Sequence, residues 1–193
     1  MKLDLSKIED DEKFRQLILF ICRRSEGDPP FGATKLNKLL FYCDFLAYLK
    51  FGRPLTGHRY QKLPHGPAPR AIVPVLRQME QEHLTATAER DYLNRKQKRT
   101  FALKDADLST FTANEIAMVT DMIQECWGKS ATEMSQMTHR FRGWRLAEEG
   151  EDIPYEVATV KFEKLTGRDM ALTPEERSEL MALVGEGHSG NAN

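Results

Sequence analysis

The spacing of hydrophobic positions predicts a mainly helical chain. Apolar residues recur every three or four positions in residues 10–24, which predicts an amphipathic helix. Residues 34–50 are apolar on almost every side, a pattern typical of a helix at the centre of a domain. Shorter patterns of the same period predict further helices over 68–83, from 112 to 127 and from 130 onward.

Two other segments have a different pattern. Residues 84–103 alternate at both ends around a polar, basic connection, which predicts a β-hairpin. A short strand is predicted near Tyr60, ahead of a turn between Pro64 and Pro69. The fold class expected from these patterns is mainly α, with some β (α+β): a single compact helical domain with a small β-hairpin.

Helix-start signals refine the element boundaries. Thr112 with Glu115, and Ser130 with Glu133, have the spacing of capping boxes, so each pair predicts the first turn of a helix. A helical segment is also expected from Ile153. We expect one domain over residues 1–167, a C-terminal helix over 168–184 beside it, and a disordered tail over 185–193.

Composition and charge exclude several classes of protein. The 193 residues carry 28 Lys and Arg against 29 Asp and Glu, so a protein built mainly to coat nucleic acid is disfavoured. The longest apolar run, residues 17–22, is far too short to cross a membrane. The N-terminus lacks the apolar region of a signal peptide, and three scattered cysteines predict buried thiols without disulfides. These features favour a cytoplasmic location.

The residues with catalytic potential form no complete site. His65, in the segment Lys62-Leu-Pro-His-Gly-Pro67, has no carboxylate, thiol or hydroxyl within several residues to make it a catalytic base. A structural or partner-contacting role is therefore favoured for His65. His139 could meet it across the fold, which leaves a hydrolase as an alternative, and acids such as Asp44 are predicted to be solvated or salt-bridged. We expect no metal, no cofactor and no enzymatic activity.

The predicted hairpin carries the clearest signal for nucleic acid. A basic hairpin beside a helix is similar to a winged-helix arrangement, in which the hairpin contacts phosphates. A DNA-binding regulator is therefore the alternative function. Its predicted contact residues are Arg90, Arg95, Lys96, Lys98 and Arg99.

An ordered set of short motifs resembles the Panacea-domain family, the SocA-like antitoxins. The segment Lys35-Leu-Asn-Lys-Leu-Leu-Phe-Tyr-Cys-Asp44 resembles a helix of that family, and Gly52-Arg-Pro-Leu55 resembles the turn after it. Tyr60-Gln-Lys-Leu-Pro-His-Gly-Pro67 is similar to a segment ending in Gly-Pro. The motifs that follow are Thr138-His139, Trp144 and Ile153-Pro154-Tyr155. The resemblance covers about residues 10–160.

The resemblance implies a binding protein. Panacea-domain proteins act as antitoxins of bacterial or phage-linked toxin–antitoxin pairs, and one branch delivers its toxin to a protease. The implied partner is a cognate toxin protein, encoded by an adjacent gene, and the family supplies no established catalytic residues. DNA and a second copy of the chain remain open as further partners.

We expect the toxin-binding surface to combine two segments that lie side by side, the Gly-Pro loop and the segment from His139 to Trp144. Standard protein interfaces depend on a few aromatic or arginine anchors, which the residue types here supply. Trp127 and the Met134/Met137 pair are predicted to be core instead. The predicted contact residues are Tyr60, Lys62, His65, Gly66, Pro67, Arg70, His139, Phe141, Arg142 and Trp144.

Overall fold

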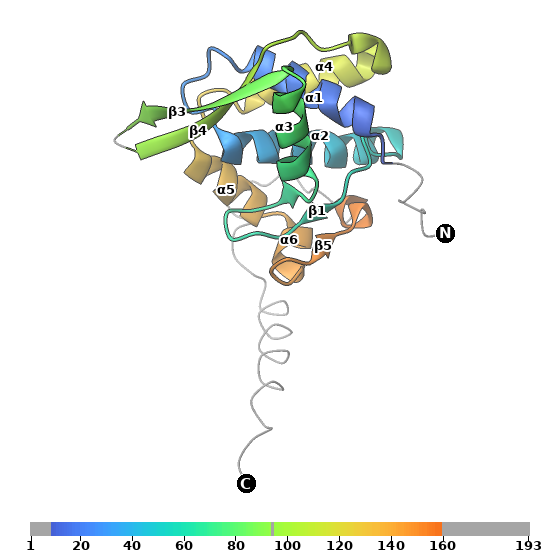
Figure 1. Ribbon diagram of the computed structural model, residues 1–193. Coiled ribbons are helices and arrows are strands. Elements are labelled where there is room, and N and C mark those ends of the chain that lie inside the picture. The colour runs from blue at the N-terminus through green and yellow to red at the C-terminus, as the bar shows by residue number, and fades with distance from the viewer. Residues whose placement is uncertain (1–8, 94, 160–193) are drawn as a thin grey trace. The chain divides into compact units, whose positions relative to one another are not determined.

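A single long helix, α2 (Ala33–Phe51), occupies the middle of the domain. The computed structural model describes residues 9–93 and 95–159 (Figure 1). Helices α1 (Asp11–Arg24), α4 (Ala113–Glu125) and α5 (Ala131–His139) all pack against α2. This surrounding explains why α2 is apolar on nearly every side and confirms the central position predicted for it.

The first turns of α1 and α4 are fixed by local hydrogen bonds and by one buried ion pair. The Asp10 carboxylate accepts from the Lys13 backbone N–H at 2.8 Å, and the predicted Thr112/Glu115 capping box is confirmed. The Lys13 ammonium lies 3.0 Å from the Glu115 carboxylate in a buried pair. The two helix N-termini are therefore held together as well as capped.

A small antiparallel sheet joins distant parts of the chain. Strand β1 (Tyr60–Gln61) pairs with β2 (Ala68–Pro69) on one side and with β5 (Asp152–Ile153) on the other. Because residues 68 and 69 are in a strand, the helix predicted from 68 begins only at α3 (Ile72–Gln81). The helix predicted from Ile153 is wrong at its start, since Ile153 lies in β5 and a 3-10 helix, η3 (Tyr155–Thr159), follows.

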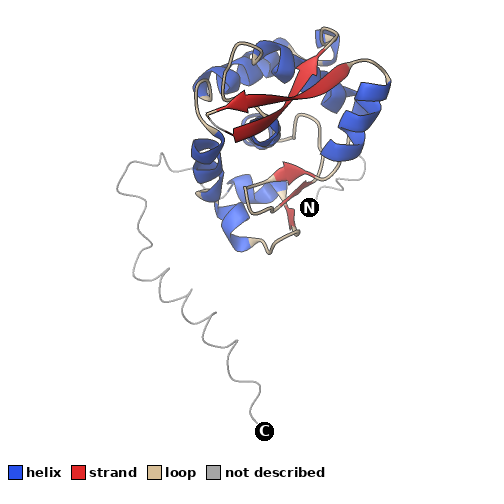
Figure 2. Cartoon of the chain, turned by 60° about the vertical axis from the view of Figure 1, so that its left-hand side comes forward, coloured by secondary structure: helices blue, strands red, loops and turns tan. Residues whose placement is uncertain are grey.

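The predicted hairpin is confirmed and is longer than the alternation alone indicated. Strand β3 (Thr85–Tyr92) pairs with β4 (Arg95–Ala102) along its whole length. The basic residues predicted for a connecting loop therefore lie within the strands. Figure 2 shows this hairpin and the small sheet as separate elements in different parts of the domain.

Two short helices complete the described fold: the 3-10 helix η2 (Leu108–Thr110) and α6 (Arg142–Leu146). The predicted Ser130/Glu133 capping box opens α5, Met134 is buried, and all three cysteines are buried and free, as predicted. The prediction that Trp127 belongs to the core is wrong, because its side chain is 47% exposed.

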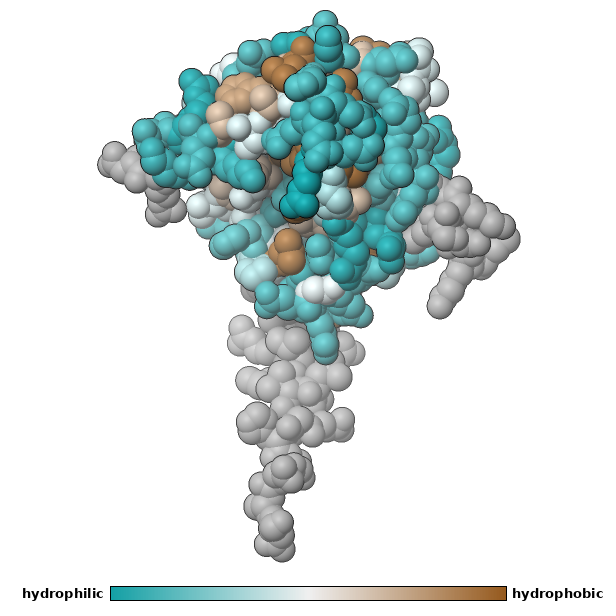
Figure 3. Space-filling model, in the orientation of Figure 1, coloured by the Kyte–Doolittle hydropathy of each residue, from teal (hydrophilic) through white to brown (hydrophobic). Residues whose placement is uncertain are grey.

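The mainly helical α+β fold class is confirmed. The helix predicted over 168–184 and the tail over 185–193 lie outside the described residues. Within the described part, no helix is long and apolar enough to cross a membrane. The face seen in Figure 3 is mostly polar, with scattered apolar residues.

Candidate functional site

Gly66 fits closely between two helices at the centre of the Gly-Pro loop. Its N–H donates to the Leu63 carbonyl at 2.8 Å, which closes a tight turn, and its φ of +99° is one that glycine adopts readily. A Cβ atom at this position would lie 2.5 Å from Thr138 Oγ1 and 2.6 Å from Lys38 Cε. The loop therefore contacts both α2 and α5, and only glycine allows that approach.

Beneath the loop, Lys38 projects from α2 into a buried position. Its ammonium donates to the Pro67 carbonyl at 3.1 Å. Burial lowers the pKa of Lys38 to about 7, because the charged form loses its hydration. A lysine of the family-like helix motif thus holds the loop from below.

The loop and the segment after α5 lie side by side, as predicted. Ser135 Oγ donates to the His65 carbonyl at 2.9 Å, and Trp144 Nε1 donates to the Leu63 carbonyl at 3.3 Å. Both hydrogen bonds join residues more than 60 positions apart in the sequence. We call the surface formed by residues 62–67, Arg70 and residues 135–144 the Gly-Pro face.

An aromatic stack stabilises the Gly-Pro face. The rings of His139 and Trp144 are stacked with centroids 3.9 Å apart, and the Lys62 ammonium lies 4.5 Å from the Trp144 ring centroid. Burial, reinforced by the positive charge of Lys38, lowers the pKa of His139. His139 is therefore favoured in its neutral form, which suits stacking and hydrogen bonding better than it suits an acid role.

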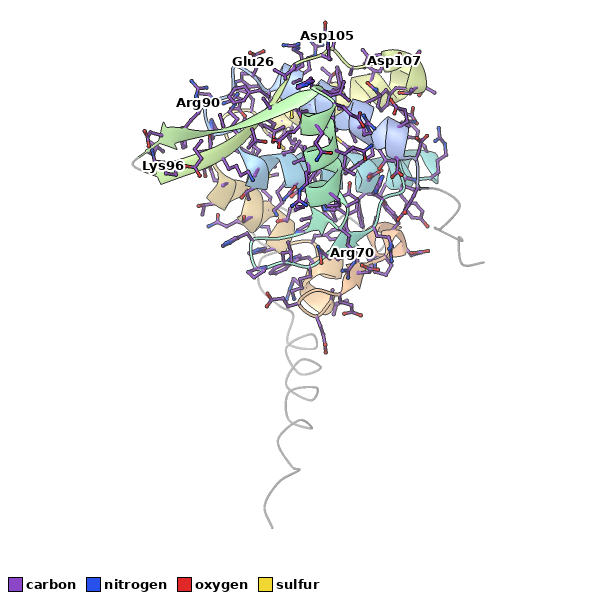
Figure 4. The ribbon with its side chains drawn as sticks, in the orientation of Figure 1. Glu26, Arg70, Arg90, Lys96, Asp105 and Asp107 are labelled. Carbon is purple, nitrogen blue, oxygen red and sulfur yellow. The ribbon has the colours of Figure 1, made fainter. Side chains whose placement is uncertain are left out.

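Two predicted contact residues of this region are exposed. His65 is exposed on the outside of the loop, and its backbone carbonyl accepts a hydrogen bond from Ser135. Arg70 follows the loop, and its guanidinium bonds with Asp152, the Gly150 carbonyl and, at 3.1 Å, Gln61. Figure 4 shows Arg70 at the opposite end of the domain from the hairpin residues Arg90 and Lys96.

Two predicted anchors are in the core instead of on the surface. Tyr60 is 1% exposed, and its hydroxyl donates to Asp44 at 2.7 Å. Phe141 is also buried, with its ring 5.2 Å from Phe41 and 5.4 Å from Phe45 between centroids. Gly66 and Pro67 are buried too, and the side chain of Arg142 lies outside the described part.

Asp44 was missed as a structural centre, since it was predicted to be solvated or salt-bridged. Its carboxylate is fully buried and accepts from the Thr56 N–H and hydroxyl, both at 2.6 Å, and from Tyr60. Burial raises the pKa of Asp44, and those hydrogen bonds oppose the shift. Two features of the sequence pointed to an inward position: Asp44 follows Leu40 by four residues, and its helix is apolar on almost every side.

The hairpin offers less to nucleic acid than its sequence indicated. Arg99 is buried, and its guanidinium donates to the carbonyls of Asp28 at 3.1 Å, of Ser25 at 2.9 Å and of Glu26. Its prediction as a phosphate contact is therefore wrong. Arg90, Lys96 and Lys98 are exposed, Lys96 forms an ion pair with Asp91 at 2.8 Å, and the side chain of Arg95 is not described.

The described residues contain no group of three or more His, Cys, Asp or Glu side chains arranged to hold a metal ion. His65 and His139 are in the same region, but no carboxylate of residues 9–93 or 95–159 forms a hydrogen bond with either imidazole. The Gly-Pro face presents a stacked indole, an exposed imidazole and basic side chains.

Fold and site together define a small α+β domain that holds an aromatic and basic surface against a central helix. The chain belongs to the antitoxin SocA-like, Panacea-domain family, whose model matches residues 36–145, more than half of the chain. The matched range runs from α2 into α6 and contains the whole Gly-Pro face. No match was found among curated proteins or among solved structures.

Proposed function

We propose that this protein is an antitoxin that binds and neutralises a cognate protein toxin encoded by an adjacent gene, without catalysing a reaction. Family membership is the observation that carries the proposal. The absence of a nucleophile–base pair at the Gly-Pro face of the described structure is consistent with it. The proposed place of action is the cytoplasm, where the toxin is made.

The Gly-Pro face supports a role in toxin binding because its parts are already fixed. The hydrogen bonds of Ser135 and Trp144 hold the loop, and the stack of His139 on Trp144 holds the indole. A surface ordered before binding loses little conformational entropy when a partner docks. Tryptophan and arginine are also the residue types most enriched at energetic centres of interfaces.

Co-expression with the protein encoded by the neighbouring gene tests the proposal. The toxin should arrest growth alone, and this protein should restore growth. The double variant His65→Ala/Arg70→Ala should bind the toxin about 30-fold more weakly, as expected for a loss of ~2 kcal/mol at an interface centre. Calorimetry on the purified pair measures that change.

A matched control separates the Gly-Pro face from the rest of the surface. The variant Arg77→Ala/Gln124→Ala removes two exposed side chains on α3 and α4 and should bind the toxin like the wild type. Equal binding by the wild type and the His65/Arg70 variant, with the fold intact, would exclude this surface. Failure of the wild type to restore growth with any neighbouring gene would exclude the antitoxin function.

Two ways of neutralising the toxin are distinguished in a purified system. If binding masks the toxin, the wild-type protein should block toxin activity with no protease present. If the protein is an adaptor, the toxin should be lost only when a cellular protease is added. We favour masking, because a preordered face can cover a toxin directly.

DNA binding is the weaker alternative. Arg99 is unavailable, Lys96 is paired with Asp91, and Glu89 also lies in β3, so the hairpin offers fewer free cations than its sequence indicated. A strong nucleic-acid footprint requires several free cations on one surface.

A further inference from the structure

The hairpin leaves one sheet edge open to another strand. Strand β3 pairs only with β4, and the described residues provide no main-chain hydrogen bond to its other edge between Thr85 and Tyr92. Natural proteins usually protect such an edge with proline, a bulge or an inward charge. The first half of β3, Thr85–Ala88, has none of these devices.

The register identifies which main-chain groups face the open edge. The Leu103 N–H donates to the Leu84 carbonyl, so this pair is hydrogen-bonded, and antiparallel pairs alternate from there. The odd-numbered residues of β3 therefore direct their N–H and C=O groups away from β4. These residues are Thr85, Thr87, Glu89 and Asp91.

A groove of about 620 Å³ is lined by the first half of β3 and by residues of the neighbouring strand and helix. Thr85 to Glu89 line it without interruption, together with Glu80, His83, Lys98 and Leu103. Thr85 itself is only 2% exposed, whereas Leu103 is 50% exposed. A groove and unpaired main-chain groups thus coincide along the part of β3 that follows Thr85.

We infer that the occupant is β3 of a second copy of this chain, paired antiparallel about a twofold axis at Ala88. The two hairpins then form one continuous four-stranded sheet. A twofold contact uses the same surface of both chains, so the strand must be complementary to itself. This dimer does not depend on the toxin and goes beyond the antitoxin function proposed above.

The two halves of β3 meet that requirement. Thr85–Ala88 carries small side chains, and Glu89–Asp91 carries charges. With Ala88 on the axis, Thr87 lies opposite Glu89 of the second copy and Thr85 lies opposite Asp91 of the second copy. No like charges face each other in this register.

Apolar contacts support the same register. Leu93, at the hairpin tip, is 77% exposed. The twofold brings Leu93 of one copy level with His83 of the other, at the end of the groove where Leu103 is exposed. Each dimer would therefore cover both copies of Leu93, which gives the pairing an apolar driving force.

Cysteine cross-linking tests the register. Ala88 would face its own copy in a non-hydrogen-bonded pair, with Cα atoms about 4.5 Å apart, so Ala88→Cys should form a disulfide dimer on mild oxidation. Ala86→Cys is the matched control, since residue 86 and its copy would be ~14 Å apart, four residues at ~3.4 Å each. The native cysteines are buried and do not compete.

Removing one N–H tests the pairing itself. The wild-type chain should sediment at about twice 22.2 kDa. Thr87→Pro should be monomeric with an unchanged circular dichroism spectrum, because β4 does not use the Thr87 N–H, whereas Thr87→Ala should stay dimeric. A monomeric wild type, a dimeric Thr87→Pro variant, or Ala86→Cys cross-linking as readily as Ala88→Cys would overturn the proposal.

Discussion

Lys38 and Lys35 show how one helix motif uses two similar side chains differently. Both are buried in α2, one turn apart. The Lys35 ammonium lies 2.5 Å from the Asp28 carboxylate, so its charge is compensated. Lys38 has the Pro67 carbonyl as its hydrogen-bond acceptor and forms no ion pair with any described residue. A buried ammonium without a counter-ion disfavours the folded state while it is charged.

The stability of the fold should therefore depend on pH through Lys38. Its pKa is about 7 when folded and 10.5 in its ordinary state, so between these values the unfolded chain binds the additional proton. The free energy of unfolding should rise with pH across that window, by at most ~1.4 kcal/mol per pH unit. Urea titrations of the wild type and Lys38→Met should show an advantage of the variant near pH 7 that shrinks toward pH 10.

The Lys35→Met variant provides the contrast, because it leaves Asp28 buried without its partner. The free energy of unfolding of this variant should be about 3–5 kcal/mol lower than that of the wild type across the same pH range. A pH dependence in Lys38→Met as steep as in the wild type would show that another group is responsible.

Residue identity alone did not determine exposure in the Gly-Pro region. Tyr60 and His65 are five positions apart in one motif, yet Tyr60 is buried and His65 is exposed. Their types suit both the core and an interface, and Tyr60 is drawn inward by the carboxylate of Asp44, 16 residues away. Such a partner has no local signature in the sequence.

At the scale of elements, the Gly-Pro loop depends on a glycine for two separate reasons. Gly66→Ala should destabilise the protein by more than ~2 kcal/mol, since a Cβ atom meets Thr138 and Lys38 in addition to the strain of a positive φ. Gly52→Ala isolates the strain, because Gly52 has φ of +72° and nothing within 4 Å of a Cβ. The Gly52→Ala variant should lose only about 1 kcal/mol of unfolding free energy. Thermal denaturation compares the two, and equal losses would contradict the close packing of the loop.

Elements that depend on interactions between residues close in the sequence were predicted well. Very short strands, which depend on their partner strand, were not. Both capping boxes and the hairpin were predicted, because their hydrogen bonds join residues near one another in the chain. Strands β2 and β5 were missed, since each has two residues and no periodicity. Their partner in β1 stabilises them, and for β5 that partner lies about 90 residues earlier.

At the scale of the whole molecule, Arg99 attaches the hairpin to the helical body. Its guanidinium reaches three carbonyls in the turn between α1 and α2, and its charge lies over the Phe31 ring at 5.4 Å. An arginine can satisfy several acceptors at once because its donors are fixed in one plane. This residue therefore has an architectural role, and its charge is not offered to solvent.

Neutralising two neighbouring basic residues should separate that role from surface charge. Arg99→Gln should lower the free energy of unfolding by about 3 kcal/mol, since several charge-assisted hydrogen bonds are lost from a buried site. Lys98→Gln, on the exposed face of the same strand, should change it by less than ~0.5 kcal/mol. Chemical denaturation measures both, and an equally stable Arg99→Gln variant would contradict the architectural role.

The sequence by itself determined the helical class, the central place of α2, the capped starts of α4 and α5, the hairpin and the family. Those features follow from the periodicity of hydrophobic residues and from interactions between residues that are close together in the chain. Tertiary structure alone decided which polar groups are buried, which aromatic residues form the surface, and that the Gly-Pro loop lies against Ser135 and Trp144. These depend on contacts between residues far apart in the chain, and one sequence contains no record of such distances.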